Sequence, residues 1–365
     1  MRHLRLDPTI VIAVLALAIL GTVMVFSASA VRADTEYGGD AYYYFKRQIF
    51  FLIAGIIALV AGAAIPYGVW EKSVMLLMGI TIFLLVLVLT PAGYTANNAS
   101  RWFRIGPVSL QIGEFTKLVV VMYLARFLSS RGERLRTEPK LIIPPLLIMA
   151  AVFFLVASEP DLGTAMFIGM LGCVMLFISG VPVRFLAGIG LASMPVIAYL
   201  IMVKDFRVER MKAFLDPWKE YSGSGFQLVQ SYVAFGDGGL FGTGLGAGKA
   251  KLFFLPESHT DFILSVIGEE MGFVGVAIVL ALFGILIVKG MRVSAAAPDS
   301  FGAILGAGLT LMIGLQALIN CMVVLGLVPT KGLPLPYISY GGSSLLTSMI
   351  AAGILLNVAG RSKEA

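Results

Sequence analysis

Long apolar runs separated by short polar connections occupy almost the whole chain. A helix that spans a bilayer needs about 20 mostly apolar residues. Charge-free runs of this order or somewhat shorter cover residues 9–31, 48–70, 73–100, 141–158, 162–183, 185–203, 300–330 and 332–360. Two more apolar runs, 110–128 and 262–288, carry charged residues inside them. The pattern predicts an all-α polytopic membrane protein with about ten transmembrane helices in a single domain over residues 1–365.

The basic residues in the short connections indicate the orientation of these helices. Cytoplasmic connections carry an excess of lysine and arginine. A cytoplasmic N-terminus places Lys72, the basic run 131–140, Arg184, Lys289 and Arg361 together on the cytoplasmic side. An even number of spans then returns the C-terminus to the cytoplasm as well.

The outer connections differ in length. Residues 204–262 form a large extracytoplasmic loop between the predicted helices 7 and 8. Val208, Met211 and Leu215 share one helical face in this loop, which predicts a short helix lying in the membrane interface. The stretch 226–235 is a second helical candidate. Asp161, in a much shorter outer turn, is expected to cap the helix that follows it.

Composition and charge indicate which class of ligand the outer surface suits. Hydrophobic residues make up 58% of the chain and charged residues 13%, against about 25% charged residues in a typical soluble domain. The formal net charge is +6, and the long outer loop is rich in lysine and arginine. A basic surface beside a membrane suits an anionic ligand or acidic membrane lipids. No nucleic-acid partner is expected, and Cys173 and Cys321 lack metal-ligand spacing.

A glycine-rich stretch, residues 235–249, invites comparison with nucleotide-binding loops. Gly242, Gly244 and Ala247 formally match a dinucleotide fingerprint, but no predicted strand precedes them and the stretch lies outside the cell. A phosphate loop needs Ser or Thr after its lysine, whereas Ala250 follows Lys249 in this chain. We therefore expect a flexible, tight loop, with phosphate contact by its backbone N–H groups as the less favoured alternative.

Asp261 stands where the long polar loop enters the next apolar run. An ionisable residue at such a boundary is costly unless it is solvated or paired, so a functional role is its default interpretation. We predict that Asp261 acts as a general base. His259 is a second candidate because imidazole titrates near neutrality, although a structural role is favoured for it.

Other charged groups are expected near the same outer surface. Arg101 and Trp102 fit either an interface anchor or a clamp on a phosphate headgroup. Glu114 and Lys117 are three residues apart, so they share a helix face and pair, either to bind substrate or to hold the fold. Lys331 lies in an irregular Pro- and Gly-rich segment and is well placed to meet an anionic group.

Several motifs together resemble one family. They are Arg101-Trp102, Gln111 with Glu114 and Lys117, and the segments 159–164, 255–262, 268–270 and 334–345. The chain is similar in these motifs to the SEDS family of shape, elongation, division and sporulation proteins, over about residues 7–357. Thr330-Lys-Gly and Asp216-Pro-Trp resemble the division branch more than the rod-shape branch.

The resemblance implies ten membrane helices and a peptidoglycan glycosyltransferase that polymerises lipid II, the undecaprenyl-diphosphate-linked disaccharide peptide. It implies a place in the bacterial inner membrane at the division septum. The implied partners are a class B penicillin-binding protein (an FtsI-like transpeptidase) and other divisome proteins. No cofactor is specified; a divalent cation such as Mg or Mn could share the neutralisation of the diphosphate, but no carboxylate cluster in the sequence indicates one.

By the same resemblance, Asp261 matches the aspartate that the family needs for catalysis. The expected substrate-binding residues are Arg101, Trp102, Glu114, Lys117, Glu257, His259, Lys331 and Ser339. No metal ligands are expected. The alternatives are a transporter that flips lipid II, the elongation or sporulation member of the same family, and a non-enzymatic division scaffold. A transporter favours sites near the bilayer midplane and internal inverted repeats, and we see no convincing repeat.

Overall fold

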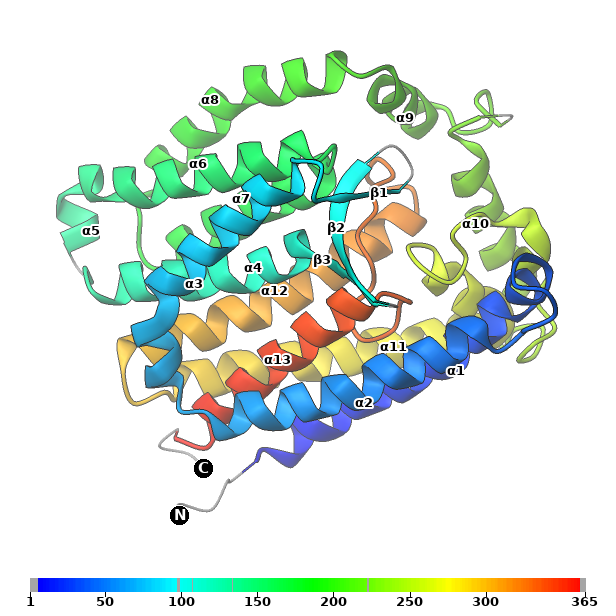
Figure 1. Ribbon diagram of the computed structural model, residues 1–365, viewed down its shortest axis with the longest axis horizontal. Coiled ribbons are helices and arrows are strands. Elements are labelled where there is room, and N and C mark those ends of the chain that lie inside the picture. Colours follow the sequence, from blue (N-terminus) through cyan, green and yellow to red (C-terminus); the bar gives the residue numbers. More distant parts are fainter. Residues whose placement is uncertain (1–5, 97–98, 107, 133, 222, 362–365) are drawn as a thin grey trace.

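The computed structural model describes residues 6–96, 99–106, 108–132, 134–221 and 223–361. Helices dominate, and the long ones lie side by side in one bundle (Figure 1). These are α1 (Pro8–Glu36), α2 (Tyr43–Ala64), α3 (Tyr67–Val88), α4 (Ile112–Ser129), α6 (Ile143–Ser158), α7 (Leu162–Ile178), α8 (Val183–Met202), α11 (Ile263–Ala295), α12 (Ser300–Val324) and α13 (Gly342–Ala359). The shorter elements are α5 (Arg134–Thr137), η1 (Pro139–Ile142), α9 (Asp205–Leu215), α10 (Phe226–Gly238) and η2 (Ala250–Phe254).

The bundle agrees with the predicted number of membrane spans. Within the described residues, 8 helices are long and apolar enough to cross a membrane. Helix α7 is apolar but has only 17 residues, and α4 carries Glu114, Lys117 and Arg126. Both nevertheless pack inside the bundle, α4 against α3 and α12, and α7 against α6 and α4. The prediction of a helical, polytopic membrane protein is therefore confirmed.

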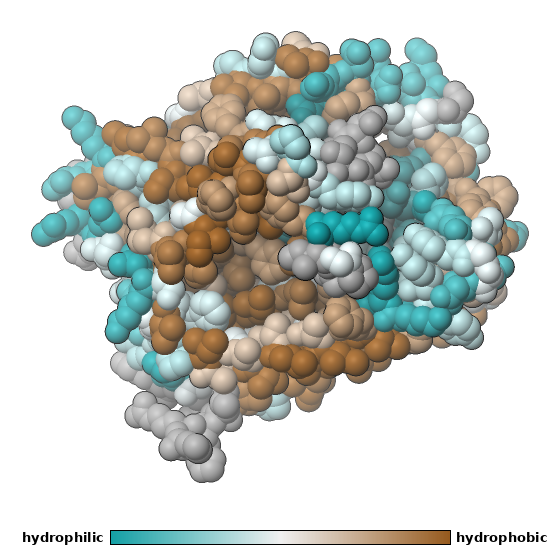
Figure 2. Space-filling view, in the orientation of Figure 1, coloured by the Kyte–Doolittle hydropathy of each residue, from teal (hydrophilic) through white to brown (hydrophobic). Residues whose placement is uncertain are grey.

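Polar residues gather at the two ends of this bundle. Figure 2 shows a hydrophobic belt across its middle and hydrophilic side chains toward both ends. The first and last described residues, Leu6 and Arg361, lie at the same end (Figure 1). Helix α5 is also at the end where α4 finishes, whereas α9, α10 and the small sheet lie at the other end (Figure 1). We call these the termini end and the loop end.

Small residues allow the central helices to approach closely. Helices α2 and α13 pack along one another. A Cβ atom at Gly353 would lie 2.2 Å from the Leu59 carbonyl oxygen, and one at Gly62 would lie 3.1 Å from the Ile350 carbonyl oxygen. Membrane helices associate through such close packing because lipid gives little hydrophobic drive. These glycines therefore set the distance between α2 and α13.

Helix α8 is the least enclosed of the membrane helices. None of its residues is buried, and it contacts α7 and α9 at the edge of the bundle (Figure 1). Leu191, Met194 and Tyr199 are more than half exposed, at 66%, 62% and 67%. Apolar side chains on all sides of an exposed membrane helix are expected to face lipid.

A small antiparallel sheet corrects the purely helical prediction. Strands β1 (Tyr94–Ala96), β2 (Ala99–Ile105) and β3 (Val108–Gln111) pair in the order β1-β2-β3 at the loop end. The sequence had suggested one apolar span over 73–100, whereas α3 already ends at Val88. Pro91 and Gly93 follow directly and break the helix. Hydropathy alone missed this change because the residues after the break are still largely uncharged.

The long loop contains the two short helices that the sequence predicted. Helix α10 covers the expected stretch and α9 covers the predicted amphipathic one. The buried residues of α9 lie outside the predicted apolar face, and the position of that face in the membrane interface remains a prediction. Arg207 and Ala213 are buried, whereas Leu215 is 78% exposed. The Arg207 guanidinium donates to the Leu200 carbonyl oxygen at 2.6 Å, which ties α9 to the end of α8.

Candidate active site

The glycine-rich part of the long loop inserts into a break in α11. Helix α11 is interrupted at Gly272, whose φ is +67°. In an unbroken helix the N–H groups of residues 273 and 274 would bond to the carbonyls of residues 269 and 270. Instead they donate to Gly239 and Leu240 at 2.9 and 3.1 Å. The carbonyls of Glu269 and Glu270 accept from Thr243 and Gly244 at 2.9 and 3.0 Å.

Glycine is required where the inserted segment meets the helix. A Cβ atom at Gly242 would lie 2.2 Å from the Glu270 carbonyl oxygen, and Gly242 has a φ of +80°. A Cβ atom at Gly238 would lie 1.9 Å from the Gly268 carbonyl oxygen. Only glycine fits such close backbone contact without strain. The stretch is tight, as expected, and backbone hydrogen bonds dock it on α11.

Two carboxylates at the start of α11 hold the rest of this loop. Glu269 accepts from the backbone N–H groups of Lys249 and Ala250, the first at 2.7 Å. Glu270 accepts from the Lys251 ammonium at 2.8 Å, from the Ser27 hydroxyl and from the Gly246 N–H. Buried carboxylates are tolerated when they are paired and hydrogen-bonded in this way. Their role is to dock the loop on α1 and α11.

The backbone around Asp261 is held by α12 and by the segment before α13. The Asn320 side chain donates to the carbonyl oxygen of Asp261 at 2.8 Å and to that of Leu333 at 2.9 Å. The Ser339 hydroxyl donates to the Thr260 carbonyl oxygen at 2.7 Å. These bonds fix the position of residues 260 and 261 relative to α12 and the segment before α13.

The Asp261 carboxylate itself is partly buried and makes no hydrogen bond or ion pair within the described residues. Burial raises its pKa to about 7, and the neighbouring carboxylate of Glu257 contributes to the rise while Arg210 of α9 opposes it. Loss of solvation disfavours the charged form of a carboxyl group, and nearby negative charge acts in the same direction. An unpaired carboxylate with this pKa is suited to accept a proton near neutral pH.

Arg101 holds a turn at the loop end. Its guanidinium donates to the carbonyl oxygens of Glu159 and Pro160 at 3.0 and 2.7 Å and lies 3.8 Å from the Asp161 carboxylate. Trp102 is beside it, with its ring centroid 6.0 Å from the guanidinium carbon. Arg101 therefore ties β2 to the turn between α6 and α7. Clamping of a phosphate headgroup by Arg101 remains a prediction.

Asp161 caps α7 as predicted. Its carboxylate accepts from the Thr164 N–H and the Thr164 hydroxyl, both at 3.0 Å. The Gln111 side chain donates to the same carboxylate at 3.2 Å. Glu159 in the same turn is 1% exposed, and burial, together with the Asp161 charge, raises its pKa to about 8. The motif 159–164 is thus mainly a structural junction between α6, α7 and the sheet.

Glu114 and Lys117 form the predicted ion pair. Their charged atoms are 2.7 Å apart, and the Lys117 ammonium also donates to the Gln316 side chain at 2.7 Å. Both side chains are almost fully buried. Gln316 in turn donates to the Pro334 carbonyl oxygen at 2.8 Å. The pair therefore connects α4 and α12 to the irregular segment that carries Lys331, and substrate contact by the pair remains a prediction.

Lys331 lies next to the start of α7. Its ammonium contacts the Met166 sulfur at 3.6 Å, and no ion pair to it occurs within the described residues. Burial lowers its pKa. Gly332, the next residue, is close to the Asp261 carboxylate, since a Cβ atom there would lie 3.3 Å from its Oδ2 atom. The segment 331–332 therefore passes beside Asp261, while the Lys331 side chain extends toward the start of α7.

His259, Glu257 and Ser339 surround the backbone of the same loop. His259 is 4% exposed and packs on the rings of Tyr44 and Tyr340, and burial lowers its pKa to about 4. The Glu257 carboxylate accepts from the Thr260 hydroxyl at 2.8 Å. The geometry of His259 suits the structural role that the sequence favoured. Substrate binding by these three residues remains a prediction.

Comparison with known proteins agrees with this architecture. A family model described as "Cell cycle protein", covering FtsW, RodA and SpoVE, matches residues 8–364. The chain belongs to this family. The SEDS resemblance of its motifs is thereby confirmed over nearly the full length.

Relatives of the FtsW/RodA/SpoVE family match the chain from end to end. It is 43% identical over 361 residues to "Probable peptidoglycan glycosyltransferase FtsW" of Geobacter sp. (strain M18), covering 98% of each chain. It is 40% identical over 353 residues to "Stage V sporulation protein E" of Bacillus subtilis, covering 96% of each.

Solved structures of the family have the same fold. The Thermus thermophilus rod shape determining protein RodA is 29% identical, with a TM-score of 0.73 and coverage of 99% of both chains. A chain from the structure described as "Structural coordination of polymerization and crosslinking by a peptidoglycan synthase complex" is 31% identical, with a TM-score of 0.80 and 97% coverage of both. The whole chain, including the long loop, is therefore spanned by these matches.

Proposed function

We propose that this protein is a peptidoglycan glycosyltransferase that polymerises lipid II at the outer face of the bacterial inner membrane, with Asp261 as the general base. Membership of the FtsW/RodA/SpoVE family, with full-length relatives named as peptidoglycan glycosyltransferases, supports the class of activity. The observation that carries the mechanism is the unpaired, partly buried Asp261 carboxylate with a pKa of about 7 at the loop end.

The reaction forms one glycosidic bond and breaks another bond to the same carbon. The acceptor sugar hydroxyl attacks the anomeric carbon of the donor, and Asp261 takes the hydroxyl proton as the new carbon–oxygen bond forms. The bond between that carbon and the diphosphate breaks, and the undecaprenyl diphosphate departs with the electron pair. A base with a pKa near the working pH is most effective for such a transfer.

The departing diphosphate needs positive charge close to Asp261. Arg210 of α9 is near enough to lower the pKa of Asp261 against the effect of burial, and Lys331 has no counterion among the described residues. We assign electrostatic stabilisation of the leaving group to these two cations. The described residues hold no group of three or more His, Cys, Asp or Glu side chains suited to a metal ion, and a divalent cation that shares the charge of the diphosphate remains a prediction.

The cellular setting forms part of the proposal. We infer that the termini end faces the cytoplasm, since Lys72, Arg131, Arg184, Lys289 and Arg361 follow the excess of positive charge in cytoplasmic connections. A class B penicillin-binding protein is the proposed partner, supported by the similarity to a chain of a complex that coordinates polymerisation and cross-linking. The FtsW-named relatives favour action at the division septum over the elongation or sporulation role.

Polymerisation of lipid II in proteoliposomes tests the mechanism. The full chain is reconstituted with its class B penicillin-binding partner, and glycan strands are separated on gels. Asp261→Asn should lower turnover by about 100-fold or more, the usual contribution of a general base. Asp237→Asn is the matched control, because Asp237 is an exposed aspartate of the same loop region. Wild-type turnover by a folded Asp261→Asn variant would overturn the assignment, and lipid movement without polymer would favour the flippase.

A further inference from the structure

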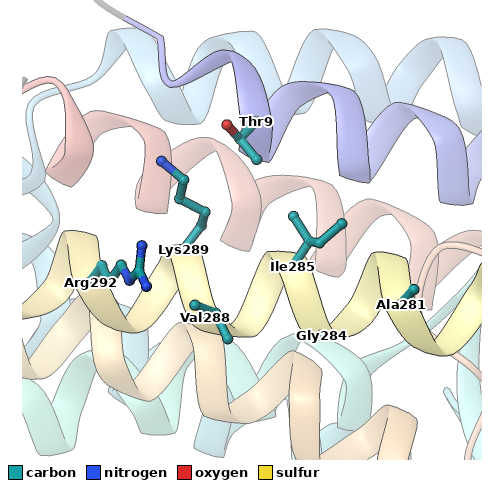
Figure 3. A pocket seen from close by; sticks show the side chains of 7 residues that line it. All are labelled: Thr9, Ala281, Gly284, Ile285, Val288, Lys289 and Arg292. Atoms are coloured by element: carbon teal, nitrogen blue, oxygen red, sulfur yellow. The ribbon is translucent and has the colours of Figure 1, made fainter.

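A groove between α1 and α11 opens at the termini end, far from Asp261. It has a volume of about 450 Å³ and is lined by Thr9, Ala281, Gly284, Ile285, Val288, Lys289 and Arg292. Figure 3 shows Lys289 extending from α11 toward the start of α1, with Thr9 on the opposite side of the groove. Most of the lining is apolar, and its two cations come from the last turns of α11.

The groove faces outward from the bundle. Ala281, Ile285, Val288 and Arg292 are exposed and recur along one side of α11 at the spacing of successive helical turns. Gly284 forms part of the floor, and a Cβ atom added there would have no neighbour within 4 Å. The groove is therefore open to the surroundings of the helix bundle.

The charges of the groove favour an anion. Lys289 and Arg292 supply two positive charges, against one negative charge from Asp7. Asp7 is already used, since its Oδ1 atom caps α1 by accepting from the N–H groups of Thr9 and Ile10 at 2.9 and 3.3 Å. Its Oδ2 atom is 3.8 Å from the Lys289 ammonium, and both side chains are partly exposed. That loose pair leaves the ammonium able to bind a second anion.

The length of the groove matches one leaflet of a bilayer. Ala281 and Arg292 lie 11 residues apart on α11, which corresponds to about 16 Å along a helix axis. Half of the hydrocarbon core of a bilayer is about 15 Å thick. An acyl chain lying along Ala281, Gly284 and Ile285 would thus bring its headgroup to Lys289 and Arg292.

We propose that this groove is a binding site for an anionic phospholipid of the inner leaflet. The phosphate is held by Lys289 and Arg292, and one acyl chain fills the apolar part beside Gly284. Basic pockets between membrane helices at the cytoplasmic surface have the chemistry to bind acidic headgroups. The bound lipid bridges α1 and α11, the two helices that also meet at the loop end through Ser27 and Glu270.

Native mass spectrometry of the full chain released from nanodiscs tests this site. The probes are phosphatidylglycerol and phosphatidylcholine, each supplied separately. Wild-type protein should retain phosphatidylglycerol in preference to phosphatidylcholine. Lys289→Gln with Arg292→Gln should weaken phosphatidylglycerol retention roughly 25-fold, about fivefold for each basic residue removed. Gly284→Leu should abolish it, because the new side chain occupies the place of the acyl chain while meeting no protein atom at its Cβ.

The control variant carries Lys140→Gln and Arg184→Gln, two exposed cations of the termini end outside the groove. It removes the same charge and should retain the lipid as wild type does. Equal retention by the groove variant and the control would overturn the proposal, and so would equal retention of the two lipids by wild type. A photo-crosslinker at Ile285 that captures a protein helix in native membranes would also overturn it, whereas a lipid adduct supports it.

Discussion

The Lys251 ammonium lies 2.8 Å from the Glu270 carboxylate, and both side chains are almost fully buried. This pair joins the long loop to the first turns of α11. Lys251→Met should lower the free energy of unfolding by about 3–5 kcal/mol, because it leaves Glu270 buried without its partner. Denaturant unfolding of purified protein in detergent measures the loss.

The double variant Lys251→Met with Glu270→Gln is the control for that measurement. It removes both charges, so most of the lost stability should return. If the double variant were as unstable as the single one, the loss would come from packing rather than from an uncompensated charge.

The polymerisation rate should depend on pH through Asp261. Only the deprotonated carboxylate accepts a proton, and its pKa is raised to about 7 by burial. We expect kcat/KM to rise about tenfold per pH unit below neutrality and to level off at about pH 7 and above. The measurement is the initial rate on lipid II between pH 5 and 9. A profile that stays flat down to pH 5 would contradict Asp261 as the base.

Stability should fall with rising pH because of Glu159. Its pKa is about 8 in the folded protein, against about 4.3 in an unfolded chain. The folded state therefore holds this proton more tightly, so its stabilising effect is complete below about pH 4 and is lost as the pH rises through about 8. Glu159→Gln mimics the protonated form and should remove this part of the pH dependence.

Thermal unfolding between pH 5 and 9 measures that difference. Glu209→Gln is the matched control, because Glu209 is an exposed glutamate of α9 and its neutralisation should leave the profile unchanged. A Glu159→Gln profile parallel to that of wild type would show that Glu159 is already ionised in the folded protein.

The break in α11 should depend on the absence of a side chain at Gly242. An added Cβ atom would lie 2.2 Å from the Glu270 carbonyl oxygen, and the φ of +80° is itself unfavourable for alanine. Gly242→Ala should therefore displace the inserted segment and increase proteolysis of the loop. Gly236→Ala on α10 has open space at its Cβ atom and should be neutral or slightly stabilising. Equal protease resistance of the two variants would contradict the role of Gly242.

The membrane bundle was predictable because a helix in lipid must satisfy its own backbone hydrogen bonds. A run of apolar residues long enough to cross the bilayer has few alternatives to a transmembrane helix. The number of spans and the position of α11 therefore follow from hydropathy. The sheet was missed because strands at the membrane surface need not satisfy their backbone hydrogen bonds within one long apolar segment. The span predicted over residues 73–100 extended too far, because uncharged residues continue past the end of α3 at Val88.

The candidate site was predictable in its chemistry but only partly in its geometry. The position of Asp261 at the loop–helix boundary and the spacing of Glu114 and Lys117 are local features of the sequence. Asn320 and Arg210 were missed, because their importance depends on contacts across the fold: Asn320 with Asp261 and Leu333, and Arg210 with the charge of Asp261. A polar residue inside an otherwise apolar run, as Asn320 is, was the available signal.

The exchange of backbone hydrogen bonds at Gly272 divides α11 into two mechanical units. Residues 263–271 are bonded to the long loop through Thr243 and Gly244, while the remainder of the helix begins anew with bonds to Gly239 and Leu240. A force applied to the outer face of the loop, for example on the exposed Phe253, would be carried to the short unit next to Asp261 before it reached the rest of the bundle. The glycine at position 272 thus couples the segment next to Asp261 to the long loop rather than to the longer part of α11.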